Sequence, residues 1–325
     1  MRLERTTGIC LTGCRCVVVS GYSMPCYAPI TAWYSRDVGV SGKRGITFRR
    51  DFAYSPASIK LPCGKCVGCR LEKSRQWAVR CMHEKKMHDK SAFVTLSYEE
   101  KYLPEGMSLC KRDLQLFMKR LRKHFGRGIR FYACGEYGDH NNRPHYHLLF
   151  FNLQFEDMTP VGRAKAGQIL YTSKVLRDLW PFGFNFIGEV TFDSCAYVAR
   201  YIMKKVSGDV AESHYQVLTS DGEIIDREPE FTVMSRRPGI GAGWFDRYHS
   251  EVYSFDTVIT NGREAKPPRF YDLRFELLDA MRLETLKKVR RRKALMNKAD
   301  NTLRRLRVRE TVELRKLAFY KTRVL

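Results

Sequence analysis

The order of strand-like and helix-like patterns between residues 91 and 208 constrains the fold of this chain more than any other feature. Short apolar runs predict β-strands at 92–97, 129–134, 145–151 and 184–190. Apolar residues at helical spacing predict helices at 112–125 and 172–180. The resulting order, βαββαβ, is typical of the ferredoxin-like split βαβ plan. We therefore expect an α+β protein with an antiparallel sheet flanked by helices.

Pattern and composition divide the whole chain into five segments. They are an N-terminal extension at 1–23, a Cys-rich metal-stabilised module with its helix at 24–90, the core at 91–208, a loop-rich completion of the core at 209–272 and a basic helical tail at 273–325. Met24 offers a second start, so we interpret the extension as dispensable. A helix is expected at about 70–89, and another at about 194–206, capped by Asp193 or Ser194 and followed by Gly208.

The charge of the chain indicates a polyanionic partner. It carries 58 Lys and Arg against 35 Asp and Glu, a formal charge of +23, of which residues 282–325 hold +12. Nucleic acid fits this surplus, and an anionic membrane surface is the competing partner. The basic tail, with Arg290, Arg291 and Arg292, would track phosphates without reading bases, or would simply form a solvated helix face.

No apolar run reaches the roughly 18 residues that a membrane-spanning helix needs, and the run at 16–19 is too short for a signal peptide. We expect a soluble protein in a reducing cytoplasm, with no membrane partner. Eleven cysteines in such a protein favour a thiolate metal site over disulfides.

Three of these cysteines follow one another at regular spacing. Cys63, Cys66 and Cys69 lie three residues apart between glycines that permit a tight loop, and Cys26 is the expected fourth ligand of a structural zinc site. An iron–sulfur cluster, or three incidental buried cysteines, are the alternatives. The weaker candidates for the fourth ligand are Cys10 and Cys81.

A pair of histidines begins the third expected strand. Residues i and i+2 of a strand face the same side, so His145 and His147 can reach one metal ion. A hairpin through Gly138–Asn142 would bring Glu136 alongside them. Two imidazoles and one carboxylate leave open positions on Mn²⁺ or Mg²⁺, with Zn²⁺ as an alternative, although a lone pair of histidines is more often structural.

Two tyrosines lie four residues apart in the helix expected after the fourth strand. Tyr197 and Tyr201 therefore share a helix face, and the cations Arg200 and Lys204 each follow one of them by three residues. A phenol has a pKa near 10, so a tyrosine nucleophile needs positive charge nearby. The alternative is a helix that buries two aromatic rings beside a solvated basic face.

These motifs, in this order, resemble those of the HUH endonuclease superfamily, and more narrowly the replication initiation proteins of microviruses of the gokushovirus group. The resemblance covers about Met24 to Asp272. The stretches that carry it are PCGKCVGCRLEKSRQWA at 62–78, FVTLSY at 93–98, KRDLQLFMKRLRKHF at 111–125, ACGEYGDHNNRPHYHLLFF at 133–151, LWPFGF at 179–184, YVARYIMKK at 197–205 and EFTVMSRRPGIG at 230–241.

The resemblance implies a five-stranded antiparallel sheet with a metal on its face and the tyrosine helix laid against it. It implies strand cleavage at a replication origin that leaves a 5′-phosphotyrosine and a free 3′-OH for rolling-circle replication. The implied metal ligands are His145, His147 and Glu136, and the implied nucleophiles are Tyr197 and Tyr201. We expect Tyr201 to make the first cut, because Lys204 and Lys205 add more positive charge than Arg200 gives Tyr197.

The same resemblance places Thr95 and Tyr98 in a strand beside the site, where they would contact DNA together with Lys205. Many relatives have Lys where this chain has Arg200, which alters the hydrogen-bond geometry of the phosphate clamp. No GxxxxGK[ST] or polymerase signature is present, so a host polymerase and helicase in the bacterial cytoplasm would be partners. The rival functions are a mobilisation relaxase or transposase, and a non-catalytic zinc-stabilised DNA-binding protein.

Overall fold

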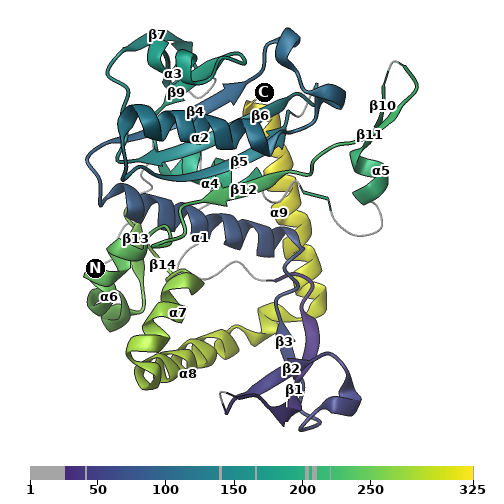
Figure 1. Ribbon diagram of the computed structural model, residues 1–325. Helices are drawn as coiled ribbons and strands as arrows, with labels where there is room; N and C mark the ends of the chain where they lie inside the picture. The colour runs from purple at the N-terminus through teal and green to yellow at the C-terminus, as the bar shows by residue number, and fades with distance from the viewer. Residues whose placement is uncertain are drawn as a thin grey trace, which may run out of the picture. The chain divides into compact units, whose positions relative to one another are not determined.

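The computed structural model describes residues 26–324, apart from 41, 139–140, 165–166, 202–204, 207–210 and 220. Figure 1 shows its helices and strands. The described residues form two compact units. The first unit runs from Ser74 to Asp279, and the second combines the residues up to Lys73 with Ala280–Arg323. Within the described residues, no helix is both long and apolar enough to span a membrane.

A seven-stranded sheet, counted over the described residues, is the centre of the first unit. Its strands, in spatial order, are β12 (Phe231–Met234), β5 (Arg130–Tyr137), β6 (Pro144–Phe151), β4 (Ser91–Ser97), β9 (Asn185–Gly188), β8 (Ile169–Ser173) and β7 (Met158–Arg163). Every neighbouring pair is antiparallel. The edge strand β7 is exposed beyond Met158, contains Pro160, and shifts register between Pro160 and Gly162.

The four predicted strands are present and take the order β5-β6-β4-β9. Strand β6 lies between β4 and β5, which α2 (Lys111–Phe125) connects in sequence. The predicted α+β class, with an antiparallel sheet flanked by helices, is confirmed. The sheet is larger than the five strands that the resemblance implied, because the β7–β8 hairpin extends one edge and β12 pairs with β5 at the other.

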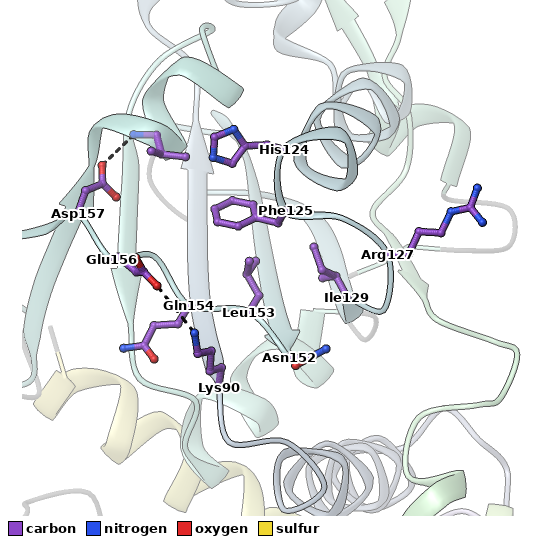
Figure 2. A pocket seen from close by; sticks show the side chains of 11 residues that line it. Lys90, His124, Phe125, Arg127, Ile129, Asn152, Leu153, Gln154, Glu156 and Asp157 are labelled. Carbon is purple, nitrogen blue, oxygen red and sulfur yellow. Dashed lines mark hydrogen bonds and ion pairs between the residues drawn. The ribbon is translucent and has the colours of Figure 1, made fainter.

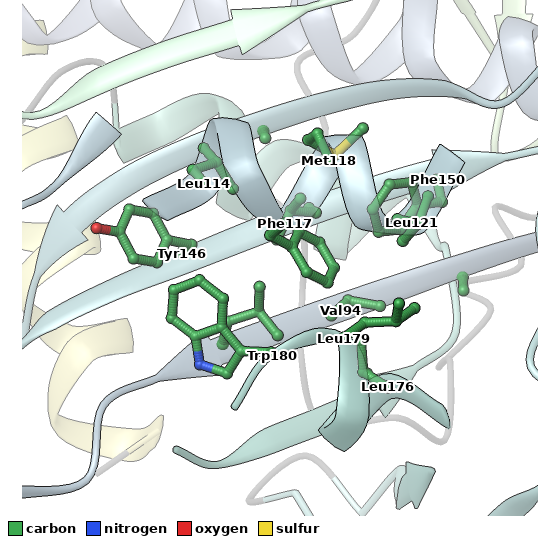
Figure 3. Close-up of a cluster of buried hydrophobic side chains, with 14 of the residues drawn as sticks. Val94, Leu114, Phe117, Met118, Leu121, Tyr146, Phe150, Leu176, Leu179 and Trp180 are labelled. Atoms are coloured by element: carbon green, nitrogen blue, oxygen red, sulfur yellow. The ribbon is translucent and has the colours of Figure 1, made fainter. Parts of the chain in front are cut away.

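Helices α2 and α3 (Lys174–Leu179) cover one face of the sheet (Figure 3). Helix α2 buries the apolar stripe that its sequence predicts, made of Leu114, Phe117, Met118 and Leu121. Trp180 packs among Phe117 and other aromatic rings, and its indole Nε1 donates to the Ser97 carbonyl oxygen at 2.9 Å. Burial of these rings provides much of the free energy that holds the sheet to its helices.

Helices α1 (Val67–Lys85) and α4 (Phe192–Tyr201) contribute to the cluster on the opposite face. Cys81 and Cys195, one from each helix, are fully buried there with Tyr132 and Leu149 of the sheet. Two further helices, α6 (Ala242–Phe255) and α7 (Arg269–Leu278), contact α1 through aromatic rings. The remaining elements of the first unit are η2 (Glu100–Tyr102), η3 (Glu105–Met107), α5 (Ala211–Tyr215) and the hairpins β10 (Gln216–Leu218) with β11 (Ile224–Asp226) and β13 (Val258–Thr260) with β14 (Arg263–Ala265).

Two helix starts differ from the prediction. Helix α3 begins at Lys174, because residues 169–173 form strand β8 and Ser173 caps the helix by accepting a hydrogen bond from the Leu176 N–H at 3.0 Å. Helix α4 begins at Phe192, so the predicted caps Asp193 and Ser194 lie inside it. Its N-terminus is held by Thr191, whose Oγ1 accepts from the Ser194 N–H at 3.1 Å.

Other helix boundaries also differ. Helix α1 begins at Val67, within the cysteine motif, rather than at residue 70. Residues 207–270, expected to hold only loops and short strands, contain the 14-residue helix α6. The tail begins with α7 at Arg269 and is broken before α8 and again before α9. Gly208, the expected stop after α4, lies outside the described residues.

The second unit contains a small three-stranded sheet and the last two helices. The sheet has the order β2 (Arg44–Thr47), β1 (Ile30–Val38), β3 (Ile59–Leu61), and η1 (Arg50–Phe52) follows β2. The helices are α8 (Ala280–Met296) and α9 (Leu303–Val324), separated by η4 (Lys298–Asn301). This unit holds the Cys-rich segment that the sequence marked as metal-stabilised.

Candidate functional site: a histidine–glutamate pair, a tyrosine helix and a cysteine cluster

The hairpin between β5 and β6 brings the predicted metal ligands to one face of the sheet. Glu136 pairs directly with His145, and Cys134 pairs with His147. Strand β4 lies on the other side of β6, where Thr95 pairs with His147. Since side chains of paired residues share a face, Glu136, His145, His147 and Thr95 all point to the side that α4 covers.

His147 and Glu136 form a buried pair. The Nε2 atom of His147 lies 2.9 Å from Glu136 Oε1, and its Nδ1 atom lies 3.0 Å from Thr95 Oγ1. Both partners are almost fully buried, at 6% and 4% exposure. Thr95 therefore orients the His147 ring from one side while the carboxylate holds it from the other.

His145 is half-buried next to this pair. Its Nδ1 donates to the Arg143 carbonyl oxygen at 2.7 Å, which leaves Nε2 with its lone pair. Burial lowers the pKa of His145, which favours the neutral form that binds metals. The donor types suit a divalent cation. However, the ligand atoms of His145, His147 and Glu136 do not all lie within 4.8 Å of one another, a distance that the cysteines below satisfy.

Helix α4 places Tyr197 against the histidine–glutamate pair. The Tyr197 ring meets the His147 ring edge-on, with 5.2 Å between ring centroids. The helix buries Val198 and Ala199, whereas Tyr197 and Arg200 are exposed. Tyr201 is the last residue of α4, but its side chain and all of Lys204 lie outside the described residues. Lys205 is exposed.

Two hydrogen bonds from α1 hold the tyrosine helix in place. Ser74 is buried, and its hydroxyl donates to the Ala196 carbonyl oxygen at 2.9 Å, one residue before Tyr197. Lys85 Nζ donates to the Val190 carbonyl oxygen at 2.6 Å, just before the helix begins. Neither residue was singled out from the sequence, because a contact across more than a hundred residues leaves no local signal.

The structure separates Thr95 from Tyr98, which were expected to contact DNA together. Thr95 faces His147, whereas Tyr98 is only 2% exposed and lies on the opposite face of the sheet. The Tyr98 hydroxyl donates to Asp113 Oδ2 at 2.7 Å and lies 3.0 Å from the Tyr146 hydroxyl. Tyr98 is therefore part of the core, and the expectation that it contacts DNA is corrected.

The four predicted cysteines come together in the second unit. Cys26, Cys63, Cys66 and Cys69 have sulfur atoms that all lie within 4.8 Å of one another. The Cys63–Cys69 and Cys66–Cys26 sulfur pairs are 4.0 and 3.9 Å apart. A zinc ion bound tetrahedrally at about 2.3 Å would hold its sulfur ligands about 3.8 Å apart. The cluster could thus hold one metal ion such as zinc.

Backbone N–H groups surround the cysteine sulfurs. Tyr27, Cys63 and Cys66 donate to the sulfurs of Cys66, Cys26 and Cys63 at 3.3, 3.2 and 3.2 Å. Burial raises the pKa of Cys66, but the N–H groups of Cys69 and Tyr27 lower it more, and the result is about 7. These groups favour the thiolate that a metal requires. Cys81 is buried in the first unit, away from the cluster, and Cys10 lies outside the described residues.

The remaining candidates lie elsewhere. Arg291 and Arg292 are exposed on α8, and Arg290 is half-buried beside them. The hollow in Figure 2 is lined by Lys90, His124 and Arg127, among others. Lys90 precedes β4, whereas His145 pairs with the last residue of that strand. The hollow thus lies at the other end of the sheet and is not part of the histidine–tyrosine site.

Comparison with known proteins identifies the class of protein that has this sheet and site. Residues 91–206 match the model of a family of replication-associated proteins that is named for the protein ORF2. That range contains the sheet strands β4 to β9, the histidine–glutamate pair and the tyrosine helix.

Individual relatives extend the match beyond this core. The chain is 34% identical over 259 residues to replication-associated protein VP4 of Bdellovibrio phage phiMH2K, which covers 76% of each chain. It is 36% identical over 229 residues to replication-associated protein ORF2 of Spiroplasma virus 4, covering 66% of this chain and 68% of the relative. The chain therefore belongs to the family of phage replication-associated proteins. No solved structure matches it significantly.

Proposed function

We propose that this protein initiates rolling-circle replication of a phage genome as an HUH-type endonuclease, cutting single-stranded DNA at the origin with a tyrosine. Family membership supports the role in replication. The observation that carries the cutting chemistry is the contact of Tyr197 with His147, whose other ring atoms meet Glu136 and Thr95. A phenol beside a buried imidazole–carboxylate pair is an arrangement suited to nucleophilic attack on phosphate.

In the proposed reaction the Tyr197 phenol oxygen attacks the scissile phosphorus and forms a P–O bond to the protein. The bond from phosphorus to the 3′ oxygen breaks, and that oxygen takes up a proton to become the free 3′-OH. The phenol proton leaves to solvent, to which the Tyr197 ring is open. Arg200, exposed three residues further along α4, would stabilise the negative charge on the phenolate and phosphate.

The residues that would hold a catalytic divalent cation are His145, His147 and Glu136. Mn²⁺ or Mg²⁺ bound there would polarise the scissile phosphate and offset its charge. Thr95 would act on His147 by orienting its ring. The cysteine cluster would hold a structural zinc ion, because the sulfur spacing leaves room for one ion rather than an iron–sulfur cluster.

Two successive cuts complete a replication cycle, and two tyrosines on one helix supply both without an exchange of subunits. The contact with His147 favours Tyr197 for the first cut, in contrast to the choice of Tyr201 from local charge. The bond energy stored in the phosphotyrosine lets the second cut rejoin the product strand without a nucleotide cofactor. A host polymerase would extend the 3′-OH, and a host helicase would unwind the template.

The test is to trap the covalent adduct on labelled single-stranded origin DNA with Mn²⁺ and to map the modified tyrosine by mass spectrometry. We expect an adduct on Tyr197, reduced single-turnover cutting in Tyr197→Phe, and none in the Tyr197→Phe/Tyr201→Phe variant. An adduct in the double variant would show that neither tyrosine is the nucleophile. Tight DNA binding without any adduct would favour the non-catalytic DNA-binding alternative.

A further inference from the structure

The small sheet of the second unit exposes an unusual number of aromatic side chains. Tyr34, Phe48, Phe52 and Tyr54 are each between 47% and 62% exposed. Aromatic side chains normally contribute their large area to a core, so several exposed together indicate a binding surface. We call these four rings, with Arg44 and Arg49, the aromatic–arginine surface.

Hydrogen bonds and register hold several members of this surface close together. The Tyr54 N–H donates to the Tyr34 carbonyl oxygen at 2.8 Å, so the two tyrosines belong to adjacent segments. Tyr34 pairs with Ile46 of β2, and Phe48 directly follows that strand. The rings are therefore spread over one small sheet, rather than scattered over the chain.

Arginines are fixed against two of the rings. The guanidinium carbon of Arg44 lies 3.6 Å from the centre of the Tyr54 ring, and that of Arg49 lies 4.6 Å from the centre of the Phe52 ring. Arg44 also donates to the Ser35 carbonyl oxygen at 3.3 Å. Each pair combines a flat apolar surface with a positive charge, and stays exposed enough to reach a ligand.

The charge of the second unit is strongly positive. From residue 22 to 73 and from 280 to 323 the sequence has 25 Lys and Arg against 7 Asp and Glu, a surplus of 18 out of the total of 23. The cysteine cluster also touches this sheet, since Cys26 precedes β1 and Cys63 follows β3. A metal there would tie both ends of the sheet and fix the surface before any ligand arrives.

We infer that the aromatic–arginine surface binds single-stranded DNA, with bases stacked on Tyr34 and Phe48 and with phosphates held by Arg44 and Arg49. Exposed rings interleaved with cations match the chemistry of a single strand, which offers a π-face at each base and a charge at each phosphate. A duplex hides its base faces. The inference rests on the proposed function only for the identity of the ligand, because the surface belongs to a different unit from Tyr197.

The experiment measures binding separately from cutting. The full-length, zinc-loaded protein is titrated with a fluorescent single-stranded 20-mer of mixed sequence in Mg²⁺- and Mn²⁺-free buffer, over a range of KCl concentrations. Tyr34→Ala/Phe48→Ala should weaken binding about tenfold or more without changing the salt dependence, because it removes stacking and no charge. Arg44→Gln/Arg49→Gln should lower the slope of log K against log salt by about 1.4.

Matched variants separate stacking from loss of folding. Phe255→Ala removes an equally exposed ring from the first unit and should leave affinity unchanged. Tyr34→Trp/Phe48→Trp should keep affinity, and all variants should retain their zinc and melting temperature. A duplex of the same sequence should bind Tyr34→Ala/Phe48→Ala as well as it binds the parent.

Unchanged single-strand affinity in Tyr34→Ala/Phe48→Ala would overturn the inference. So would an equal loss of duplex affinity, or a change from dimer to monomer with DNA affinity intact, which would mark a protein–protein surface. Adduct formation is scored in parallel. An adduct in a variant whose affinity has not changed leaves the proposed nicking standing and removes only this surface, whereas lost affinity without any adduct in the parent does the reverse.

Discussion

At the scale of single residues, the site depends on His147, because both of its ring nitrogens have partners. Thr95 lies at Nδ1, Glu136 at Nε2, and the Tyr197 ring stands edge-on to the imidazole. A change at His147 therefore affects the orientation of the carboxylate and of the tyrosine together. His145 differs, since one of its nitrogens is held by a backbone carbonyl and the other is left for a ligand.

We predict that His147→Ala and His145→Ala each abolish DNA cleavage while non-specific DNA affinity changes less than about twofold. Affinity comes mainly from neutralisation of phosphates by Lys and Arg elsewhere in the chain. Adduct formation with Mn²⁺ and anisotropy in chelator measure the two effects. His214→Ala, an exposed histidine in the same unit, is the control and should cut normally. Cutting at the parental rate by either site variant would rule out the metal assignment.

We predict that Cys66→Ser lowers the melting temperature by about 10 °C or more and reduces the soluble yield. Cys66 accepts N–H groups from Tyr27 and Cys69 and lies 3.9 Å from the Cys26 sulfur. Elemental analysis of the parent should find about one zinc per chain. Cys110→Ser, at a half-buried cysteine outside the cluster, should keep both zinc and stability. Iron with visible absorbance in the parent would refute the zinc assignment.

At the scale of elements, α1 joins the sheet to helices α6 and α7. His83 of α1 stacks on Trp244 of α6 at 3.5 Å between centroids, and its Nδ1 lies 2.9 Å from the Tyr271 hydroxyl of α7. Glu84, the next residue, accepts from the Gly241 N–H at 2.6 Å. Gly241 has φ +78°, and a Cβ there would lie 2.7 Å from the Tyr271 hydroxyl oxygen, so only glycine fits before α6.

We predict that His83 makes the fold sensitive to acid. Burial, assisted by the charge of Lys86, lowers the pKa of His83 to about 3, so the folded state disfavours its protonation. Its contribution to stability is complete above pH 6.5, where the unfolded histidine is also neutral, and is lost as the pH falls from 6.5 towards 3. Between pH 6.5 and 5 the loss is about 2 kcal/mol.

Chemical denaturation of the parent and of His83→Phe at pH 7 and pH 5 measures this loss. His83→Phe should be less stable than the parent at pH 7, because the hydrogen bond with Tyr271 is gone, but it should lose less stability between the two pH values. His88→Phe, on the same helix but half-exposed, is the control. Equal losses in the parent and in His83→Phe would contradict the low pKa.

The elements that the sequence predicted well are those whose pattern is local. The apolar stripe of α2 repeats every three to four residues and ends at Gly126, so both the helix and its end were predictable. Helix α6 was missed because the glycines around it, Gly239 and Gly241, resemble turn signals. Strand β8 was missed because it is a half-buried strand whose last residue also caps a helix.

The site divides in the same way. The spacing of His145 and His147, and of the three clustered cysteines, was readable because each set lies within a few residues. The pairing of Thr95 with His147 and of Ser74 with Ala196 depends on which strands and helices become neighbours. The burial of Tyr98 also depends on tertiary structure, since position along a strand gives alternation but not which face the core covers.

At the scale of the whole molecule, charge is concentrated away from the sheet. The second unit holds 18 of the 23 surplus positive charges, and the remainder of the chain holds 5, from 33 Lys and Arg against 28 Asp and Glu. We therefore expect the second unit to supply most of the DNA affinity and the first unit to supply the proposed chemistry.

We predict that replacing Arg290, Arg291 and Arg292 with Gln weakens DNA binding equally for unrelated sequences. The slope of log K against log salt for a single strand should fall by about 2, since each lost phosphate contact contributes about 0.7. Anisotropy titrations on two unrelated oligonucleotides at several salt concentrations measure both effects. The control replaces Lys119, Lys123 and Arg127 of the first unit and should change the slope less. An unchanged slope in the α8 variant would mean that these arginines are only solvated.

The exposed edge strand β7 has a consequence for how the protein behaves when it is concentrated. An unpaired strand offers its backbone N–H and C=O groups to any passing chain, which is how many proteins begin to form fibrils. Pro160 has no N–H to offer, and the register shift beside Gly162 bends the strand away from a straight partner. The sheet therefore stops growing at β7, and copies of the chain crowded on one genome have no backbone ladder through which to aggregate.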